Sequence, residues 1–146
     1  MSVAILDGPN LKQLYCGSMT FQDGSAFTIY VEDGYSSAVT GIITGSVAGL
    51  YRQLDRFYSL SVSGITATGS GTPGVITLST PLPTNLWTSP LNFPIWVQDG
   101  GTYSMGNLAI NSDGTMTISK GFGGNFTATG NCGFPEFNIS FCSYIS

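Results

Sequence analysis

Short segments of β-forming residues, separated by glycine, proline, asparagine and aspartate, follow one another along most of this 146-residue chain. The clearest example lies between residues 105 and 119, where MGNLAI and TMTIS flank the sequence NSDG. An Asp-Gly pair between alternating segments is a strong hairpin signal, because glycine adopts the positive φ of tight turns at no steric cost. The sequence therefore predicts a β-hairpin that turns at Asp113-Gly114.

Further segments have the same strand-like character, with β-branched, aromatic or alternating residues that end at turn formers. In residues 57–65, Tyr58, Leu60, Val62 and Gly64 share one face, and Phe57 and three serines take the other, which predicts a strand with one buried face. Pairing of the last two segments around Gly133–Glu136 would make a second hairpin. The predicted strands are residues 27–33, 38–44, 57–65, 74–80, 93–99, 105–110, 115–119, 126–131 and 137–144.

Helical signals are weak throughout. The best candidate is LYRQLDRF, residues 50–57, where Leu50, Leu54 and Phe57 fit one helical face. The residues that follow read as a strand, so the segment fits either a helix or a strand.

About nine or ten short strands at this spacing predict an all-β fold, with a jelly-roll-like two-sheet sandwich as the natural architecture. No internal repeat or domain boundary is evident, so residues 1–146 are expected to form a single β-sandwich domain. Residues 1–26 are expected to be a first strand or an attachment segment. The proline-rich residues 80–94 are expected to form an extended crossover between strands.

The composition excludes several classes of function. Only 8% of residues are charged, the net charge is −4, and the chain contains no histidine. Nucleic-acid binding needs clustered basic residues, and histidine-based metal sites and Ser-His-Asp triads need histidine. No apolar run is long enough for a membrane span, and the N-terminus lacks the basic region of a signal peptide. We therefore expect no nucleic-acid partner, no membrane insertion and no cofactor.

Three features invite a chemical interpretation, and each has a simpler one. Cys16, Cys132 and Cys142 lack zinc-type spacing and are expected to be free, buried thiols. The glycine-rich GFGGNF, residues 121–126, lacks the following Lys-Ser/Thr and helix of a phosphate loop, so a turn between strands is expected. Asp23, Glu32 and Asp33 lack calcium-loop spacing and are interpreted as turn residues. We therefore expect no metal site and no catalytic residue.

Aromatic residues in loops are the most informative candidates for binding. Trp87, Tyr103 and Phe122 lie in or near predicted loops, where aromatic side chains stack on sugar rings or anchor protein interfaces. These three residues are the predicted ligand-binding candidates. Trp96, inside the strand FPIWVQD, is instead expected to pack between strands or between subunits.

From Arg52 onward the order of segments also follows a known pattern. Leu82-Pro83 matches a crossover motif, whereas Asp55 stands at a usual glycine position and Leu86-Trp87 at a frequent Arg-Pro position. The residues that match the hairpin and the closing segment are Gly106, Leu108, Ile110, Asp113, Gly114, Thr115, Thr117, Ile118, Phe126, Gly130, Gly133, Ser143 and Tyr144. In these residues the chain resembles the C-terminal head domains of phage tail fibres and of spike or fibre proteins on virions.

Heads of that family are similar to C1q- and TNF-like jelly-rolls and form trimers. The resemblance implies a non-enzymatic head on the virion surface, assembled in the host cytoplasm as a homotrimer in contact with other virion proteins. It also implies attachment to a host-surface glycan or protein through exposed loops. The alternatives are a capsid-decorating or cementing protein without receptor binding, and a free carbohydrate-binding, lectin-like module.

Overall fold

The chain is all-β in the computed structural model, which describes residues 18–20, 26–28, 31–54, 57–82, 90–121 and 123–142. No helix in these ranges is long and apolar enough to cross a membrane. The strands are β1 (Ser18–Thr20), β2 (Ala26–Thr28), β3 (Val31–Gly41), β4 (Gly45–Leu54), β5 (Phe57–Val62), β6 (Ile65–Thr68), β7 (Ile76–Leu78), β8 (Leu91–Asp99), β9 (Thr102–Ile110), β10 (Met116–Lys120), β11 (Asn131–Phe134) and β12 (Phe137–Cys142).

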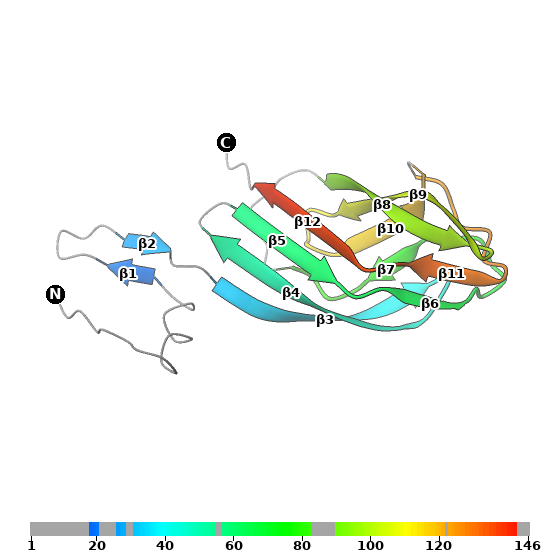
Figure 1. Ribbon diagram of the computed structural model, residues 1–146, viewed down its shortest axis with the longest axis horizontal. Coiled ribbons are helices and arrows are strands. Elements are labelled where there is room, and N and C mark those ends of the chain that lie inside the picture. The colour runs from blue at the N-terminus through cyan, green and yellow to red at the C-terminus, as the bar shows by residue number, and fades with distance from the viewer. Residues whose placement is uncertain are drawn as a thin grey trace.

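The main body is one antiparallel sheet rather than the two sheets that the sequence predicts. Its strands lie in the order β12-β5-β4-β3-β7-β10-β9-β8-β11-β6, and β1 and β2 form a separate two-stranded sheet. Figure 1 shows this body as a curled layer, with the small β1–β2 sheet beyond the start of β3. Each strand after β3 pairs antiparallel with its neighbours, as hairpins and meanders do.

Two interrupted strands close the sheet into a ring. β6 pairs with β11 from Ile65–Phe134 to Thr68–Asn131, and β5 pairs with β12 from Val62–Phe137 onward. The register is the same on both sides of the gap between these two pairings. Residues 57–68 and 131–142 therefore act as two long strands, each interrupted at its middle. Since β11 also pairs with β8 at Gly133–Gln98, the sheet returns to its own start.

The hairpin predicted around residues 133–136 is wrong, because β11 and β12 are two halves of one long strand. The segment FTATGN is not a strand either: Phe126 makes an isolated bridge with Gly74, and only Asn131 enters β11. The strands predicted at residues 27–33 and 38–44 are not separated between residues 33 and 38, since β3 runs through this segment and ends at Gly41.

The ambiguous segment 50–57 is a strand in its described part. β4 continues to Leu54 and pairs with both β3 and β5. Val47 and Tyr51 face the core, whereas Ser46, Ala48 and Arg52 are exposed. Pairing on both sides satisfies the backbone of β4 more completely than a short amphipathic helix would.

The hairpin between β9 and β10 is confirmed. Met116 faces Ile110, and Gly114 has a φ of 84° in the turn between them. Asp113 Oδ1 accepts hydrogen bonds from the backbone N–H and the hydroxyl of Thr115, at 3.0 and 2.6 Å. The GFGGNF segment is also a turn, because Lys120 and Gly124 exchange two backbone hydrogen bonds.

The core fills the inside of the ring. The predicted burial in residues 57–65 is confirmed for Tyr58, Leu60 and Val62, whereas Gly64 is exposed. Phe126 and Phe134 are the largest fully buried side chains. The start of β8 is not hydrogen-bonded to β12. The two strands meet there through Phe93 and Phe141, whose aromatic ring centroids lie 5.7 Å apart.

The ring has two distinct ends. We call the end where β3 begins and β12 finishes the base, and the opposite end the far end (Figure 1). The described connections at the far end are residues 42–44, 69–75, 100–101, 121 and 123–130. Both ends of the main-body chain therefore lie at the base, and the far end consists of loops.

Candidate functional site

The outer face of β8 and β9 carries three exposed large side chains. Trp96 and Met105 face each other across the two strands. Gln98 and Tyr103 form the next pair on the same face, toward the turn between β8 and β9. Their exposed fractions are 57% for Trp96, 56% for Tyr103 and 50% for Met105. We call these three residues the β8–β9 patch. Adjacent exposed side chains of this kind often mark a contact surface.

Of the three predicted binding residues, the structure describes one. Tyr103 lies on the exposed face of β9, whereas Trp87 and Phe122 lie outside the described residues. Trp96 does not pack between strands as the sequence predicts, because its side chain points away from the core. Its packing between subunits stays a prediction.

A polar groove lies beside the β8–β9 patch on the same outer face. Its volume is about 580 Å³. Asn107 Nδ2 donates to Asn92 Oδ1 at 2.9 Å across the β8–β9 pair. Asn111 Nδ2 donates to the hydroxyls of Thr115 and Thr117. Among the residues that line the groove are Asn92, Asn107, Ala109, Asn111, Thr117 and Ser119.

Sequence reasoning missed this groove. Asn92 lies on β8, Asn107 lies on β9, and Asn111 lies in the loop that follows β9. The last two are 15 or more residues from Asn92 along the chain. The register brings Asn92 opposite Ala109, next to Asn107, and places Thr117 on the other side of Ala109. A period-2 pattern of Asn107, Ala109 and Asn111 is the one signal in the sequence that could have indicated it.

A buried carboxylate organises the far end. Asp99, at the end of β8, is 7% exposed. Its Oδ2 accepts a hydrogen bond from Lys120 Nζ at 2.7 Å, and its Oδ1 accepts from the backbone N–H and hydroxyl of Thr127 at 3.0 and 2.8 Å. Burial raises the pKa of Asp99, but the hydrogen bonds of Lys120 and Thr127 and the charge of Lys120 outweigh it, so the pKa lies below its ordinary value.

The Asp99 contacts hold a strained loop in place. Ala128 is fully buried with a φ of 60°, a left-handed conformation that costs a non-glycine residue about 1–2 kcal/mol. Its carbonyl accepts a hydrogen bond from Gly71 N–H at 2.9 Å, which ties the loop to the one between β6 and β7. The far-end loops are thus fixed both by hydrogen bonds and by the burial of Ile42, Phe126 and Ala128 in the core.

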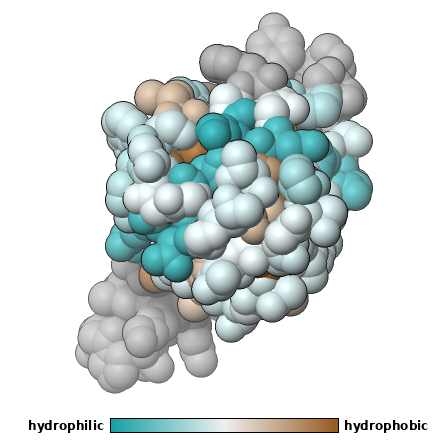
Figure 2. All heavy atoms as spheres, turned by 90° about the vertical axis from the view of Figure 1, so that its right-hand side faces the viewer, coloured by the Kyte–Doolittle hydropathy of each residue, from teal (hydrophilic) through white to brown (hydrophobic). Residues whose placement is uncertain are grey.

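The surface of the far end is mainly neutral and polar. Figure 2 looks onto this end and shows mostly white and teal residues, with brown only in small areas between them. Of the charges there, Lys120 is paired with Asp99. Hydroxyl, amide and backbone groups therefore dominate what this end can offer to a partner.

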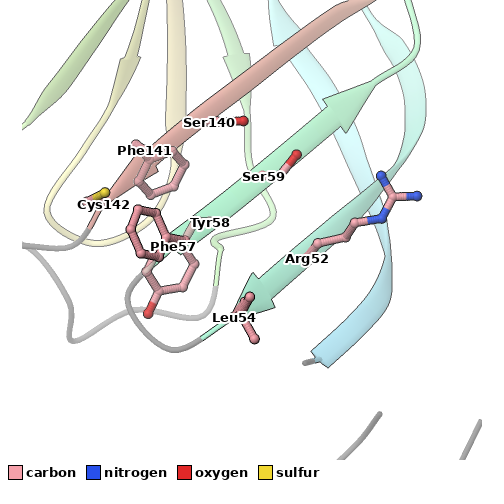
Figure 3. A pocket seen from close by; sticks show the side chains of 8 residues that line it. All are labelled: Arg52, Leu54, Phe57, Tyr58, Ser59, Ser140, Phe141 and Cys142. Carbon is pink, nitrogen blue, oxygen red and sulfur yellow. The ribbon is translucent and has the colours of Figure 1, made fainter. Parts of the chain in front are cut away.

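The base carries a different kind of hollow. An apolar pocket of about 370 Å³ lies over β4, β5 and the end of β12. Figure 3 shows the rings of Phe57 and Tyr58 beside Phe141, while the side chain of Arg52 extends toward β3. Leu54 and Phe57 are 54% and 63% exposed. Arg52 Nε lies 2.8 Å from Glu32 Oε2 in a half-exposed ion pair, so the pocket itself is essentially apolar.

Cys142, at the rim of this pocket, is exposed, which contradicts the predicted buried thiol. Buried and exposed residues alternate along β12, and Cys142 is the exposed residue that follows the core-facing Phe141. Cys132 is buried as predicted, and its Sγ lies 3.6 Å from Asp99 Oδ1. Cys16 lies outside the described residues.

Neither the groove nor the apolar pocket is lined by a carboxylate. Within the described ranges no group of three His, Cys, Asp or Glu residues is placed to hold a metal ion. Glu32 pairs with Arg52, and Asp33 Oδ1 accepts from the N–H of Gly34. These hollows offer hydrogen bonds and apolar contacts, which suits binding.

No family model matches this chain, and no curated protein matches it. Among solved structures, a reovirus attachment protein, sigma1, determined in complex with alpha-2,3-sialyllactose, is similar with a TM-score of 0.47 and 12% sequence identity. The match covers 99% of this chain and 82% of that one.

Proposed function

We propose that this chain is the head domain of a virion surface spike or fibre, that it forms a homotrimer, and that it attaches the particle to a host-surface glycan or protein. In this proposal the chain has no enzymatic activity. The trimer would resemble the C1q- and TNF-like heads of the family whose motifs the sequence carries.

The polarity of the ring carries the proposal. The chain enters β3 and leaves β12 at the base, where Leu54 and Phe57 expose apolar surface. The opposite end presents neutral polar loops held by the Asp99 contacts. A domain that is joined to a particle at one end and meets a receptor at the other needs this division.

The motif residues support the proposal through the positions they occupy. Asp113, Gly114 and Thr115 form the hydrogen-bonded turn between β9 and β10. Phe126 is fully buried, and Gly130 accepts a hydrogen bond from Gly69 N–H between two far-end loops. The resemblance thus rests on residues that shape the ring and its far end.

Size-exclusion chromatography with light scattering tests the assembly. The expected mass is three times that of the 15.3 kDa chain at micromolar concentration. A monomer at that concentration would contradict the trimeric head.

Binding of the labelled protein to host-cell surfaces and to a glycan array then tests attachment. Binding to either supports the proposal. A stable trimer that binds neither would instead favour the cementing role, in which the same ring reinforces a capsid.

A further inference from the structure

One wall of the polar groove contains a hydrogen-bonding atom with no partner. Asn107 is 7% exposed, and its Nδ2 is used by Asn92. Its Oδ1 is buried and has no hydrogen-bond partner. An unsatisfied buried acceptor is unfavourable, and in a native protein such an atom is usually met by an ordered water, an ion or a bound group.

The groove around Asn107 is built to hold neutral polar groups. Asn92 and Asn111 bring amides, and Thr117 and Ser119 bring hydroxyls, all from strands or their immediate ends. Side chains on paired strands lose little further freedom on binding, which lowers the cost of recognising a ligand. The volume of about 580 Å³ lies in the usual range of small-ligand sites.

The β8–β9 patch continues the same face. Asn107 and Met105 are two residues apart, which places successive outward side chains about 7 Å apart along the strand. Trp96 faces Met105, so its exposed ring lies beside the groove rather than on the opposite face of the sheet. Amides and hydroxyls in a groove with an aromatic ring beside it suit a ligand that has hydroxyl edges and an apolar face.

The charge of the groove selects among such ligands. The residues that line it include no lysine, arginine, aspartate or glutamate. An anionic sugar would lose its hydration there without gaining a cationic partner. A neutral sugar loses only hydroxyl hydration, which amides and hydroxyls replace.

We propose that the polar groove is a binding site for a neutral saccharide, with Asn107 accepting a hydrogen bond from a sugar hydroxyl and Trp96 contacting the apolar face of a sugar ring. The site names the receptor class of the proposed attachment function and rests on that function. It runs along the side of the ring, from Asn111 at the base to the far-end loop residues Val75 and Gly123.

Two variants test the site. Ala109→Tyr fills the groove from its middle, because Ala109 lies between Asn92 and Thr117. Asn107→Leu removes the unpartnered oxygen with little change of volume, and its thermal midpoint is expected to stay within about 3 °C of the original. Ala48→Tyr is the matched control, since Ala48 is an exposed alanine of β4 outside the groove.

The full chain and its variants are tested on an array of neutral and sialylated oligosaccharides, and positives are measured by calorimetric titration. The original protein and Ala48→Tyr should bind a neutral glycan, and Ala109→Tyr and Asn107→Leu should lose at least tenfold in affinity. Absence of binding to every neutral glycan, binding only to sialylated ones, or equal binding by Ala109→Tyr would each overturn the site.

Cell binding separates the failure of this site from the failure of the proposed function. If the protein attaches to cells and Ala109→Tyr attaches equally, the groove is not the receptor site, but the attachment function stands. If the original protein attaches to neither cells nor glycans, both fall. A changed mass of Ala109→Tyr in light scattering would show that the groove is a contact between copies, which also overturns the site.

Discussion

Tyr51 carries a hydroxyl that the fold does not use. The side chain is 3% exposed, its ring stacks on Tyr58 at 5.8 Å, and its hydroxyl is buried without a hydrogen-bond partner. Burial raises the pKa of Tyr51, and Tyr58 raises it further. The ring therefore contributes packing, and the hydroxyl contributes a desolvation cost.

We predict that Tyr51→Phe raises the free energy of unfolding by about 1 kcal/mol, because it removes an unsatisfied hydroxyl and keeps the ring. Tyr35→Phe is the control, since Tyr35 donates a hydrogen bond to the carbonyl of Thr80 at 2.9 Å. That variant should lose about 1 kcal/mol. Urea denaturation measures both, and equal effects of the two variants would contradict the assignment.

Asp99 should make the stability of the chain sensitive to acid. Its pKa is lower in the folded protein than in the unfolded chain, so its ionised form stabilises the fold above the ordinary aspartate pKa. That stability is lost as the pH falls through the lowered pKa, below about pH 4.

Asp99→Asn is therefore predicted to destabilise the protein by about 1–3 kcal/mol at neutral pH and to flatten the acid side of the stability curve. Thermal melts over a pH range of about 2 to 7 measure this. The hydrogen bonds of Thr115 also lower the pKa of Asp113. Asp113→Asn serves as the comparison, and an unchanged pH profile in Asp99→Asn would refute the role of Asp99.

At the residue scale, the sequence can predict what a side chain is suited to, but not what surrounds it. Tyr103 is a binding candidate because it follows a turn, and it is exposed. Asn107 gives no such signal, because its burial and its contact with Asn92 depend on the pairing of β8 with β9 and on the strands around them. Trp96 has the strand alternation of an outward residue, but its size favours a buried interpretation.

At the scale of elements, the two long interrupted strands are the feature that the fold depends on. Gly64 lies in the interruption of residues 57–68, opposite the interruption at Pro135 and Glu136. A Cβ on Gly64 would lie 2.7 Å from the backbone N of Glu136 and 2.9 Å from the carbonyl oxygen of Phe134. The close approach leaves room only for glycine.

We predict that Gly64→Ala destabilises the protein by about 1–3 kcal/mol, because the two long strands must move apart. Gly34→Ala is the matched control: nothing lies within 4 Å of its added Cβ, and it lies in the exposed part of β3. Alanine there should be neutral or slightly stabilising. Chemical denaturation distinguishes the two, and equal stability of both variants would contradict the predicted clash.

The sequence predicts most strands but not their partners. Alternation and turn residues mark 57–62, 93–99 and the β9–β10 hairpin, because these signals are local. The pairing of residues 57–68 with 131–142 joins segments more than 60 residues apart, and no local signal records it. Local signals favour a hairpin between β11 and β12. In the structure these strands instead pair with the distant strands β6 and β5.

At the scale of the whole molecule, one curled sheet replaces the predicted sandwich. The core residues still alternate along the strands as they would in two facing sheets, so the hydrophobic pattern does not distinguish the two. What distinguishes them is the contact of β11 with both β6 and β8. The all-β class is predictable from the sequence, whereas the closure is not.

The proposed trimer should depend on the apolar base. Leu54 and Phe57 expose large side chains at the end where the chain would join the particle. We predict that the double variant Leu54→Ser, Phe57→Ser lowers the mass measured by light scattering toward that of one chain, because apolar contact area is lost. The comparison variant Trp96→Ser, Met105→Ser should keep the mass of the original protein. The reverse pattern would move the contact between copies to the β8–β9 patch and would support the alternative from the sequence in which Trp96 packs between subunits.

The closure of the ring by residues 131–142 also has a consequence during synthesis. Until this last long strand leaves the ribosome, β6 has no partner and β8 lacks one of its two neighbours. Unpaired strand edges are templates for association with other chains. Nascent or prematurely terminated chains that stop before β11 are therefore expected to aggregate, and rapid completion of the last dozen described residues should favour correct folding.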